Sequence, residues 1–291
     1  MTRKFITIDK YINLKHLFAL VLLLVAMNAW TQQSPYDQSF RQGQGYLHWG
    51  WNRAAYTRSD IHFKGDDYDF TLYKVRAHDR PTTPITPKRY LVHLFTPQTN
   101  YKAGYFIRDN LAISFGVDHM KYVMDQDQLV TMKGNITRDV RYKGEHNGPM
   151  QLTRDFLTFE HTNGLNYINV EVEKYSTLYD SRKGKVHLRW EYGGGAGILF
   201  PKSDIKLMDY NEDNRFHVSG FGASLKAGIA AVFFHHLFWR LETKGGYIGM
   251  PDIVLHEEAT PGKVKQHFFF WETDTNLGIT ANLSGRRHKK N

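Results

Sequence analysis

The stretch Val186–Leu199 reads VHLRWEYGGGAGIL, and it alternates between apolar side chains and polar residues or glycine. Leu188 and Trp190 fall on one face of an extended chain, whereas Arg189 and Glu191 fall on the other face with the glycines. Successive side chains of a β-strand point to opposite faces of the sheet. The stretch therefore predicts a strand with one apolar face and one polar or glycine face.

The same two-residue period recurs in Gly220–Phe233, in the segment 237–248 and in Phe269–Leu283. A soluble β-sandwich also alternates, but its strands usually have about five or six residues. The strands predicted here are long enough to cross a membrane at a tilt. The fold class that we predict is all-β, an antiparallel transmembrane β-barrel.

Turn signals give the number of strands. Short turns are expected at Arg108–Asn110 and Phe234–His236, and long polar external loops at 58–97, 123–154, 200–216 and 248–264. Outer-membrane barrels combine short periplasmic turns with long external loops. This predicts eight strands with both ends inside, at 45–57, 98–107, 111–122, 155–175, 185–199, 217–233, 237–248 and 265–283. Ten strands result if Tyr68–Val75 and Arg89–Phe95 also cross the membrane.

The N-terminus has the pattern of an export signal. Basic residues precede the apolar run Leu17–Ala26, and small or polar residues follow it. The pattern predicts a signal peptide over 1–32 and a barrel domain over 33–291, ending in a short basic tail at 284–291. The chain has no cysteine, which excludes disulfides and thiolate chemistry.

The formal net charge of +9 is compatible with anionic partners, although part of it belongs to the basic tail, which we expect to be solvated. For an exported chain we expect these to be outer-membrane lipid and the phosphates of lipopolysaccharide, with no nucleic acid. Basic residues of the segment 125–154 also suggest a loop surface for an extracellular ligand: Lys133, Arg138, Arg141 and Lys143, beside Glu145. No motif predicts a metal or a cofactor, and the glycine run Gly193–Gly197 lacks the Lys-Ser/Thr ending of a phosphate-binding loop.

The inward faces of the predicted strands carry opposite charges. An eight-stranded barrel is filled by its own side chains, and buried charges have to be paired. We therefore predict a closed, salt-bridged lumen that does not act as a porin, with this charge network: Lys102, Asp118, Glu171, Arg189, Glu191, Lys226, Arg240, Glu242, Lys244, Glu272 and Asp274.

The segment Phe159–Asn169 (FEHTNGLNYIN) carries one catalytic hypothesis. It is similar, at His161, Asn163 and Gly164, to the His-x-Ser-Asn-Ala/Gly-Gly run of the eight-stranded outer-membrane lipid A deacylases. The resemblance implies acyl hydrolysis at the outer rim, with His161 as base and Glu173 as the carboxylate. Asn163 stands where that family has serine, so Thr162 or a loop hydroxyl has to be the nucleophile.

The alternation of side chains along the predicted strand also indicates the direction in which His161 points. Phe159, Leu165 and Tyr167 lie on the same face of the predicted strand as His161. Because apolar faces of a barrel strand meet lipid, the sequence predicts that His161 faces lipid unless the strand bulges near Gly164.

More broadly, the chain resembles the small outer-membrane β-barrel proteins of the Bacteroidota, at Gly50–Arg53, Ser59–Phe63, Gly116–Tyr122 and Glu160–Asn169. The resemblance implies fold and location only. Three functions stay open: a structural, adhesive or ligand-binding barrel, a lipid A acyl hydrolase, and a soluble exported β-sandwich that binds sugar or lipid.

Overall fold

The computed structural model describes residues 39–81, 98–181, 185–208, 210–212, 216–255 and 262–283. The predicted signal peptide and the basic tail lie outside these residues. The strands are β1 (Gln44–Tyr56), β2 (Ser59–Lys64), β3 (Tyr68–Val75), β4 (Ala77–His78), β5 (Thr99–Arg108), β6 (Leu111–Met124), β7 (Gln128–Ile136), β8 (Gly144–Leu152), β9 (Leu157–Asp180), β10 (Val186–Leu199), β11 (Asp204–Leu207), β12 (Tyr210–Glu212), β13 (Gly220–Phe233), β14 (Leu237–Leu255) and β15 (Gly262–Asn282).

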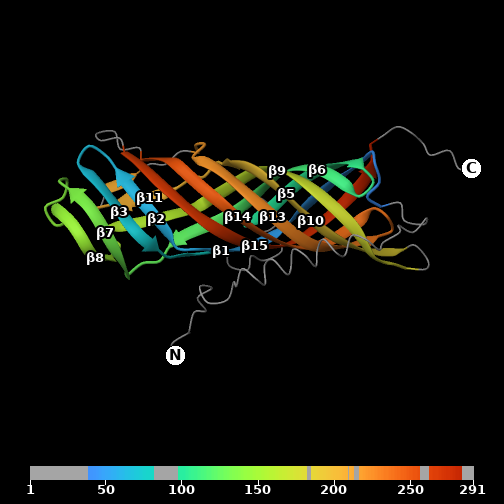
Figure 1. Ribbon diagram of the computed structural model, residues 1–291, viewed down its shortest axis with the longest axis horizontal. Coiled ribbons are helices and arrows are strands. Elements are labelled where there is room, and N and C mark those ends of the chain that lie inside the picture. The colour runs from blue at the N-terminus through green and yellow to red at the C-terminus, as the bar shows by residue number, and fades with distance from the viewer. Residues whose placement is uncertain are drawn as a thin grey trace, which may run out of the picture.

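Eight of these strands close into a ring in the order β1-β5-β6-β9-β10-β13-β14-β15. The last strand pairs antiparallel with the first, from Gln44↔Asn282 to Tyr56↔Phe270, and this pairing closes the barrel (Figure 1). The eight-stranded, all-β fold class is thus confirmed. The sandwich alternative is wrong, because the ring is one closed sheet and not two packed sheets.

The outward faces of the ring form an apolar belt. On β13, Phe221, Leu225 and Ile229 are exposed, whereas the intervening Ser224 and Lys226 are buried in the lumen. An apolar outward face of this kind is stable when lipid, and not water, surrounds the barrel. The belt comprises Leu47, Ile113, Phe115, Val170, Val172, Ile198, Phe221, Leu225, Ile229, Trp239, Leu241, Phe269, Trp271, Leu277 and Ile279.

The ring strands meet in short turns at one end, which we call periplasmic because short turns face the periplasm in such barrels. Asp109 and Asn110 form one of these turns. The first and last strands end there too, where the Leu283 amide donates to the Gly43 carbonyl at 2.9 Å. No helix in the described part of the chain is long and apolar enough to cross a membrane.

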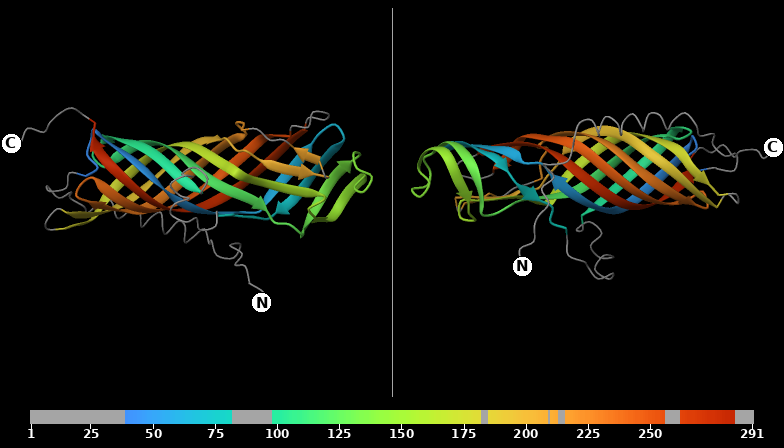
Figure 2. Two further views of the ribbon diagram at one scale, coloured as in Figure 1. Left: turned by 180° about the vertical axis from the view of Figure 1, so that it is seen from behind. Right: turned by 60° about the horizontal axis from the view of Figure 1, so that its bottom comes forward.

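At the opposite, outer end, most of the described residues form strands. β2 continues β1 along β15, and β3, β7 and β8 extend the sheet from β2 (Figure 2). We call β2, β3, β7 and β8 the platform. The predictions of loops over 58–97 and 123–154 are therefore wrong for the segments that these strands occupy. Tyr68–Val75 is a strand outside the ring, and Arg89–Phe95 lies outside the described residues.

The reversed polarity of the platform strands explains this difference. In the belt, apolar side chains point outward, whereas in the platform they point inward: Ile61 and Phe63 on β2, Phe70 and Leu72 on β3, and Met132 on β7 are fully buried or nearly so. They join Met120, Tyr122, Phe159, Leu165, Tyr167, Ile248, Met250 and Phe268, among others, in one apolar cluster, the outer core. Hydrophobic burial thus holds the outer half together.

A smaller apolar cluster fills the periplasmic end. Phe40 stacks on Phe106 with ring centroids 5.1 Å apart. The other members of the cluster are Tyr46, Ala112, Tyr175, Ala230, Val232 and Phe238. We call these residues the periplasmic plug. The interior therefore has three layers, with the charged residues between the plug and the outer core.

Candidate functional site

The charged layer contains all eleven residues of the predicted lumen network, and each of them is buried. They project from seven of the eight ring strands, all except β1, because every second residue of a ring strand points inward. Glu173, which the sequence assigned to a catalytic hypothesis, lies in the same layer and is fully buried.

Lys226 is the centre of this layer. Its Nζ atom lies 2.9 Å from Glu171 Oε2, 2.8 Å from Glu173 Oε1, 2.9 Å from Glu191 Oε1 and 2.9 Å from Glu242 Oε2. The four carboxylates come from three different strands. One ammonium group therefore ties β9, β10 and β14 to β13.

The other cations enclose the same carboxylates. Lys244 pairs with Asp118 and lies 2.9 Å from Glu171 Oε1, and Lys102 pairs with Glu171. The Arg240 Nε atom lies 2.9 Å from Glu191 Oε2. The Arg240 guanidinium also lies over the rings of Tyr46, Tyr175 and Phe238, at 5.2, 5.6 and 5.1 Å from their centroids. Cation–π contacts thus join the charged layer to the plug.

Three members of the predicted network depart from this pattern. Arg189 pairs with Asp180 at 2.8 Å, nearer the periplasmic end. Glu272 accepts a hydrogen bond from Asn100 Nδ2 at 3.1 Å and, like Asp274, has no ion pair among the described residues. The layer therefore holds more carboxylates than cations.

In the described part of the barrel, buried side chains lie at both ends of the charged layer. The plug lies below the charges and the outer core lies above them, and both consist of buried side chains. Among the described residues, no three His, Asp or Glu side chains come together as a group that could hold a metal ion.

His161 lies inside the outer core and not on the lipid side. It is fully buried, as are Phe159, Leu165 and Tyr167 on the same face of β9. The prediction that these residues face lipid is wrong. The interior of the barrel is apolar at this level, so the apolar face of the strand no longer marks the side that meets lipid. The sequence named a bulge near Gly164 only as an exception, and the strand is irregular there: its register with β6 shifts between Met120 and Tyr122, beside Gly164, which has φ +122°.

A loop hydroxyl does contact His161. The His161 Nδ1 atom lies 2.7 Å from Ser203 Oγ, and Ser203 itself is almost fully buried. His161 lies outward of Val170, where the belt begins on β9, and burial lowers its pKa to about 4. The imidazole is therefore neutral near pH 7, and it is enclosed by Tyr122 and Phe159.

The remaining residues of the catalytic hypothesis are not brought to this contact. Glu173 follows on the same strand at roughly 40 Å, given a rise of about 3.3 Å per residue. It is held in the lumen by Lys226 and accepts a hydrogen bond from Ser114 Oγ at 2.8 Å. The side chains of Thr162 and Asn163 lie outside what the structure describes.

The outward face of the platform is the surface that sequence reasoning missed. Register places Thr71 beside Lys133 and Tyr73 beside Thr131 across β3 and β7. Across β7 and β8 it places Thr131 beside Pro149 and Lys133 beside Asn147. Apart from the exposed Leu129, the outward residues of β3 and β7 are polar or tyrosine. The signal of this face in the sequence is the alternation of buried apolar residues in YDFTLYKV and QLVTMKGNI.

Two of the basic residues predicted for a ligand-binding loop are engaged within the platform. Arg138 Nε donates to Asp67 Oδ2 at 2.7 Å, and Arg141 Nη2 donates to Asp139 Oδ2 at 2.8 Å. Lys133 lies 5.9 Å from the centroid of the Tyr73 ring. Lys143 and Glu145 are exposed.

No family model and no curated protein matches the chain. Among solved structures, the outer membrane protein OprG from Pseudomonas aeruginosa aligns with 84% of this chain and 99% of its own, at 9% identity and a TM-score of 0.42. Neisserial surface protein A aligns with 82% and 99%, at 9% identity and a TM-score of 0.36. Ail of Yersinia pestis aligns with 81% and 99%, at 10% identity and a TM-score of 0.28.

The fold assignment itself rests on the closed ring and its apolar belt. A closed antiparallel barrel with an outward apolar band is the form in which strands cross the bacterial outer membrane. The chain is an outer-membrane β-barrel, as the sequence predicted.

Proposed function

We propose that the protein is a closed, non-conducting barrel that anchors a β-sheet platform outside the membrane, and that the platform makes adhesive or ligand-binding contacts. The observation that carries this proposal is the outer core. Phe63, Phe70 and Met132 are buried beneath the platform, so its strands are held as a fixed sheet. A rigid surface loses little conformational entropy when it binds a partner.

The outward face of the platform suits a polar ligand. Thr71, Thr131 and Asn147 supply hydrogen-bonding groups, and Tyr73 adds an aromatic ring beside the Lys133 ammonium group. Tyrosine combined with small polar residues is a composition that serves recognition surfaces well. An extracellular glycan has the matching chemistry.

Two cationic residues beyond the end of the belt support contact with lipopolysaccharide phosphates. On β15, Lys265 and Lys263 are exposed and follow outward from Phe269. Such exposed charges bind anions in a salt-dependent way. This contact would hold the rim of the barrel in the outer leaflet. The resemblance to the Bacteroidota barrel proteins stays a prediction.

Two measurements test the proposal. In a planar bilayer, the purified barrel is expected to give no conductance above background, and steady channel currents would refute the closed lumen. On an array of immobilised glycans, cells that display the wild-type protein should bind more than cells that display Tyr73→Ser/Lys133→Gln. The exposed Lys185→Gln variant, at the periplasmic end, is the matched control and should bind like the wild type.

The acyl hydrolase hypothesis has one supporting contact, between His161 and Ser203. Its burial and the low pKa of His161 count against it, because a general base works best when its pKa lies near the working pH. Mass spectrometry of lipid A from cells with and without the protein decides this alternative. Unchanged acylation would exclude it.

A further inference from the structure

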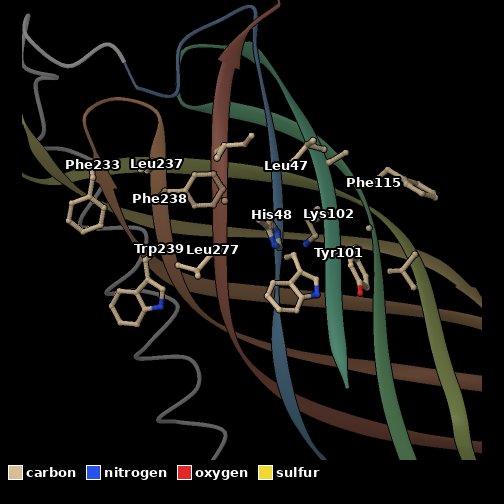
Figure 3. A pocket seen from close by; sticks show the side chains of 16 residues that line it. Leu47, His48, Tyr101, Lys102, Phe115, Phe233, Leu237, Phe238, Trp239 and Leu277 are labelled. Carbon is tan, nitrogen blue, oxygen red and sulfur yellow. The ribbon is translucent and has the colours of Figure 1, made fainter. Parts of the chain in front are cut away.

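A trough crosses the lipid-facing surface of β14, β15, β1, β5 and β6 (Figure 3). Its floor is one row of residues in lateral register: Phe238 beside Gly278, His48, Lys102 and Gly116. The side chains of His48, Lys102 and Phe238 are buried in the lumen. Toward the lipid, this row therefore presents only backbone.

The two neighbouring rows form the walls, because their side chains point outward. One wall consists of Leu237, Ile279, Leu47, Ala103 and Phe115. The other consists of Trp239, Leu277, Trp49, Tyr101 and Val117. Phe233 and Trp239 stand at one end of the trough, and Tyr101 and Phe115 stand at the other (Figure 3).

Contacts fix two of the wall residues. The Trp239 Nε1 atom donates to Thr275 Oγ1 at 2.9 Å. The Trp49 ring meets the Trp51 ring edge-on, with centroids 4.4 Å apart. The trough has a volume of about 830 Å³, within the range of roughly 300–1,000 Å³ that is typical of ligand-binding clefts.

The dimensions of the trough match one acyl chain. Four inter-strand spacings of about 4.8 Å give a length of roughly 19 Å. Half of a hydrocarbon core about 30 Å thick is roughly 15 Å, the distance that one chain spans in its leaflet. The walls carry apolar and aromatic groups and no charge, which suits a hydrocarbon tail and not a headgroup.

The position of the trough selects the leaflet. Phe233 and Leu237 directly flank the short turn Phe234–His236, so this end of the trough opens at the periplasmic edge of the belt. From there it rises toward the middle of β6. Phospholipid occupies the periplasmic leaflet of the outer membrane, whereas lipopolysaccharide occupies the external leaflet.

We propose that this trough is a binding site for one acyl chain of a periplasmic-leaflet phospholipid. The occupant would lie across β15 and β1, over the pairing that closes the barrel. A bound chain there covers the seam between the first and the last strand of the ring.

Native mass spectrometry of the barrel, purified in mild detergent from the membranes in which it was made, tests the site. Wild-type protein is expected to retain one phospholipid per barrel after detergent washing. Ala103→Phe places a large side chain into the trough from its wall, and retention should fall at least tenfold. Ala196→Phe is the matched control, because Ala196 is an exposed alanine on β10, outside the trough. It should retain the phospholipid.

Three outcomes would overturn the proposal: no phospholipid retained by the wild type, equal retention by Ala103→Phe, or retention of lipid A instead of phospholipid. A heat-dependent shift in electrophoretic mobility shows whether each variant is folded. If Ala103→Phe does not fold, Leu277→Trp enlarges the opposite wall and provides the same comparison. Retention that is unchanged in that variant also refutes the site.

Discussion

Lys226 has more ion-pair partners than any other side chain in the described lumen, since its ammonium group touches four carboxylates from three strands. We expect Lys226→Met to destabilise the barrel by about 3–5 kcal/mol, because those carboxylates lose a shared counter-charge inside a closed lumen. Urea unfolding in phospholipid vesicles, followed by the mobility shift, measures the change. The exposed Lys185→Met variant should stay within about 0.5 kcal/mol of the wild type. Equal midpoints for the two variants would contradict the central role of Lys226.

Asp274 lies in the same layer but, unlike Lys226, has no ion-pair partner among the described residues. It is buried, and no described cation lies within ion-pair distance of it. Asp274→Asn keeps the shape and removes a charge that is costly to bury. We therefore expect the same unfolding measurement to show equal or higher stability. A loss as large as that of Lys226→Met would mean that Asp274 has a counter-charge.

His161 makes stability depend on pH in a defined direction. Burial lowers its pKa to about 4 in the folded barrel, whereas the unfolded chain titrates near about 6.5. Between these values the unfolded state binds more protons. Stability therefore falls as the pH drops from about 6.5 to 4, by on the order of 3 kcal/mol.

The measurement is the unfolding midpoint at pH 7 and at pH 4.5 for the wild type and for His161→Gln. The variant should lose this part of the pH dependence. His78→Gln, at an exposed histidine of β4, should keep it. The same slope in all three proteins would show that His161 does not titrate as inferred.

At the scale of the elements, the two-residue period together with the turn signals located every strand of the ring. The segment 217–233 was predicted and β13 spans Gly220–Phe233, and 185–199 was predicted for β10. From the sequence, one platform strand, Tyr68–Val75, is predicted only as an alternative that crosses the membrane, and the other platform segments are assigned to polar loops. Phe70 and Leu72 alternate as clearly as Leu225 and Ile229, but they face inward.

The candidate sites divide in the same way. The lumen residues could be located from the sequence, since a small barrel places every second ring residue inside. The hydrogen-bond partner of His161 could not be predicted. Ser203 lies in a separate segment of the chain, so the local spacing of residues around His161 does not indicate this contact. The trough was also missed, because it depends on lateral register among five strands.

The bulge in β9 gives a prediction at this scale. Gly164 has φ +122°, and a Cβ atom there would lie 2.5 Å from Asn166 Nδ2. Gly164→Ala should therefore cost about 1–3 kcal/mol, because the backbone strain cannot be relieved in place. Gly148→Ala on β8, where a Cβ atom would meet nothing within 4 Å, should be tolerated. Unfolding midpoints compare the two, and equal effects would argue against the bulge.

The whole molecule is expected to be ordered well beyond the membrane. In hydrogen–deuterium exchange of the barrel in vesicles, amides of β3 and β7 should be protected to a degree comparable with those of the ring. The physical reason is that Phe70 and Met132 are buried in the outer core and their strands are paired on both sides. Rapid exchange throughout 128–136, while β13 stays protected, would show that the platform is a mobile loop.

The pairing of β1 with β15 has a kinetic consequence. It joins Gln44 to Asn282, near opposite ends of the described chain, whereas most other neighbours in the ring are consecutive hairpins. Contacts so distant in sequence form slowly, because a long loop has to close before they are gained. Until they form, two unpaired strand edges are available to any other extended chain. The last step of assembly is therefore the one at which the nascent barrel most needs protection from its own copies.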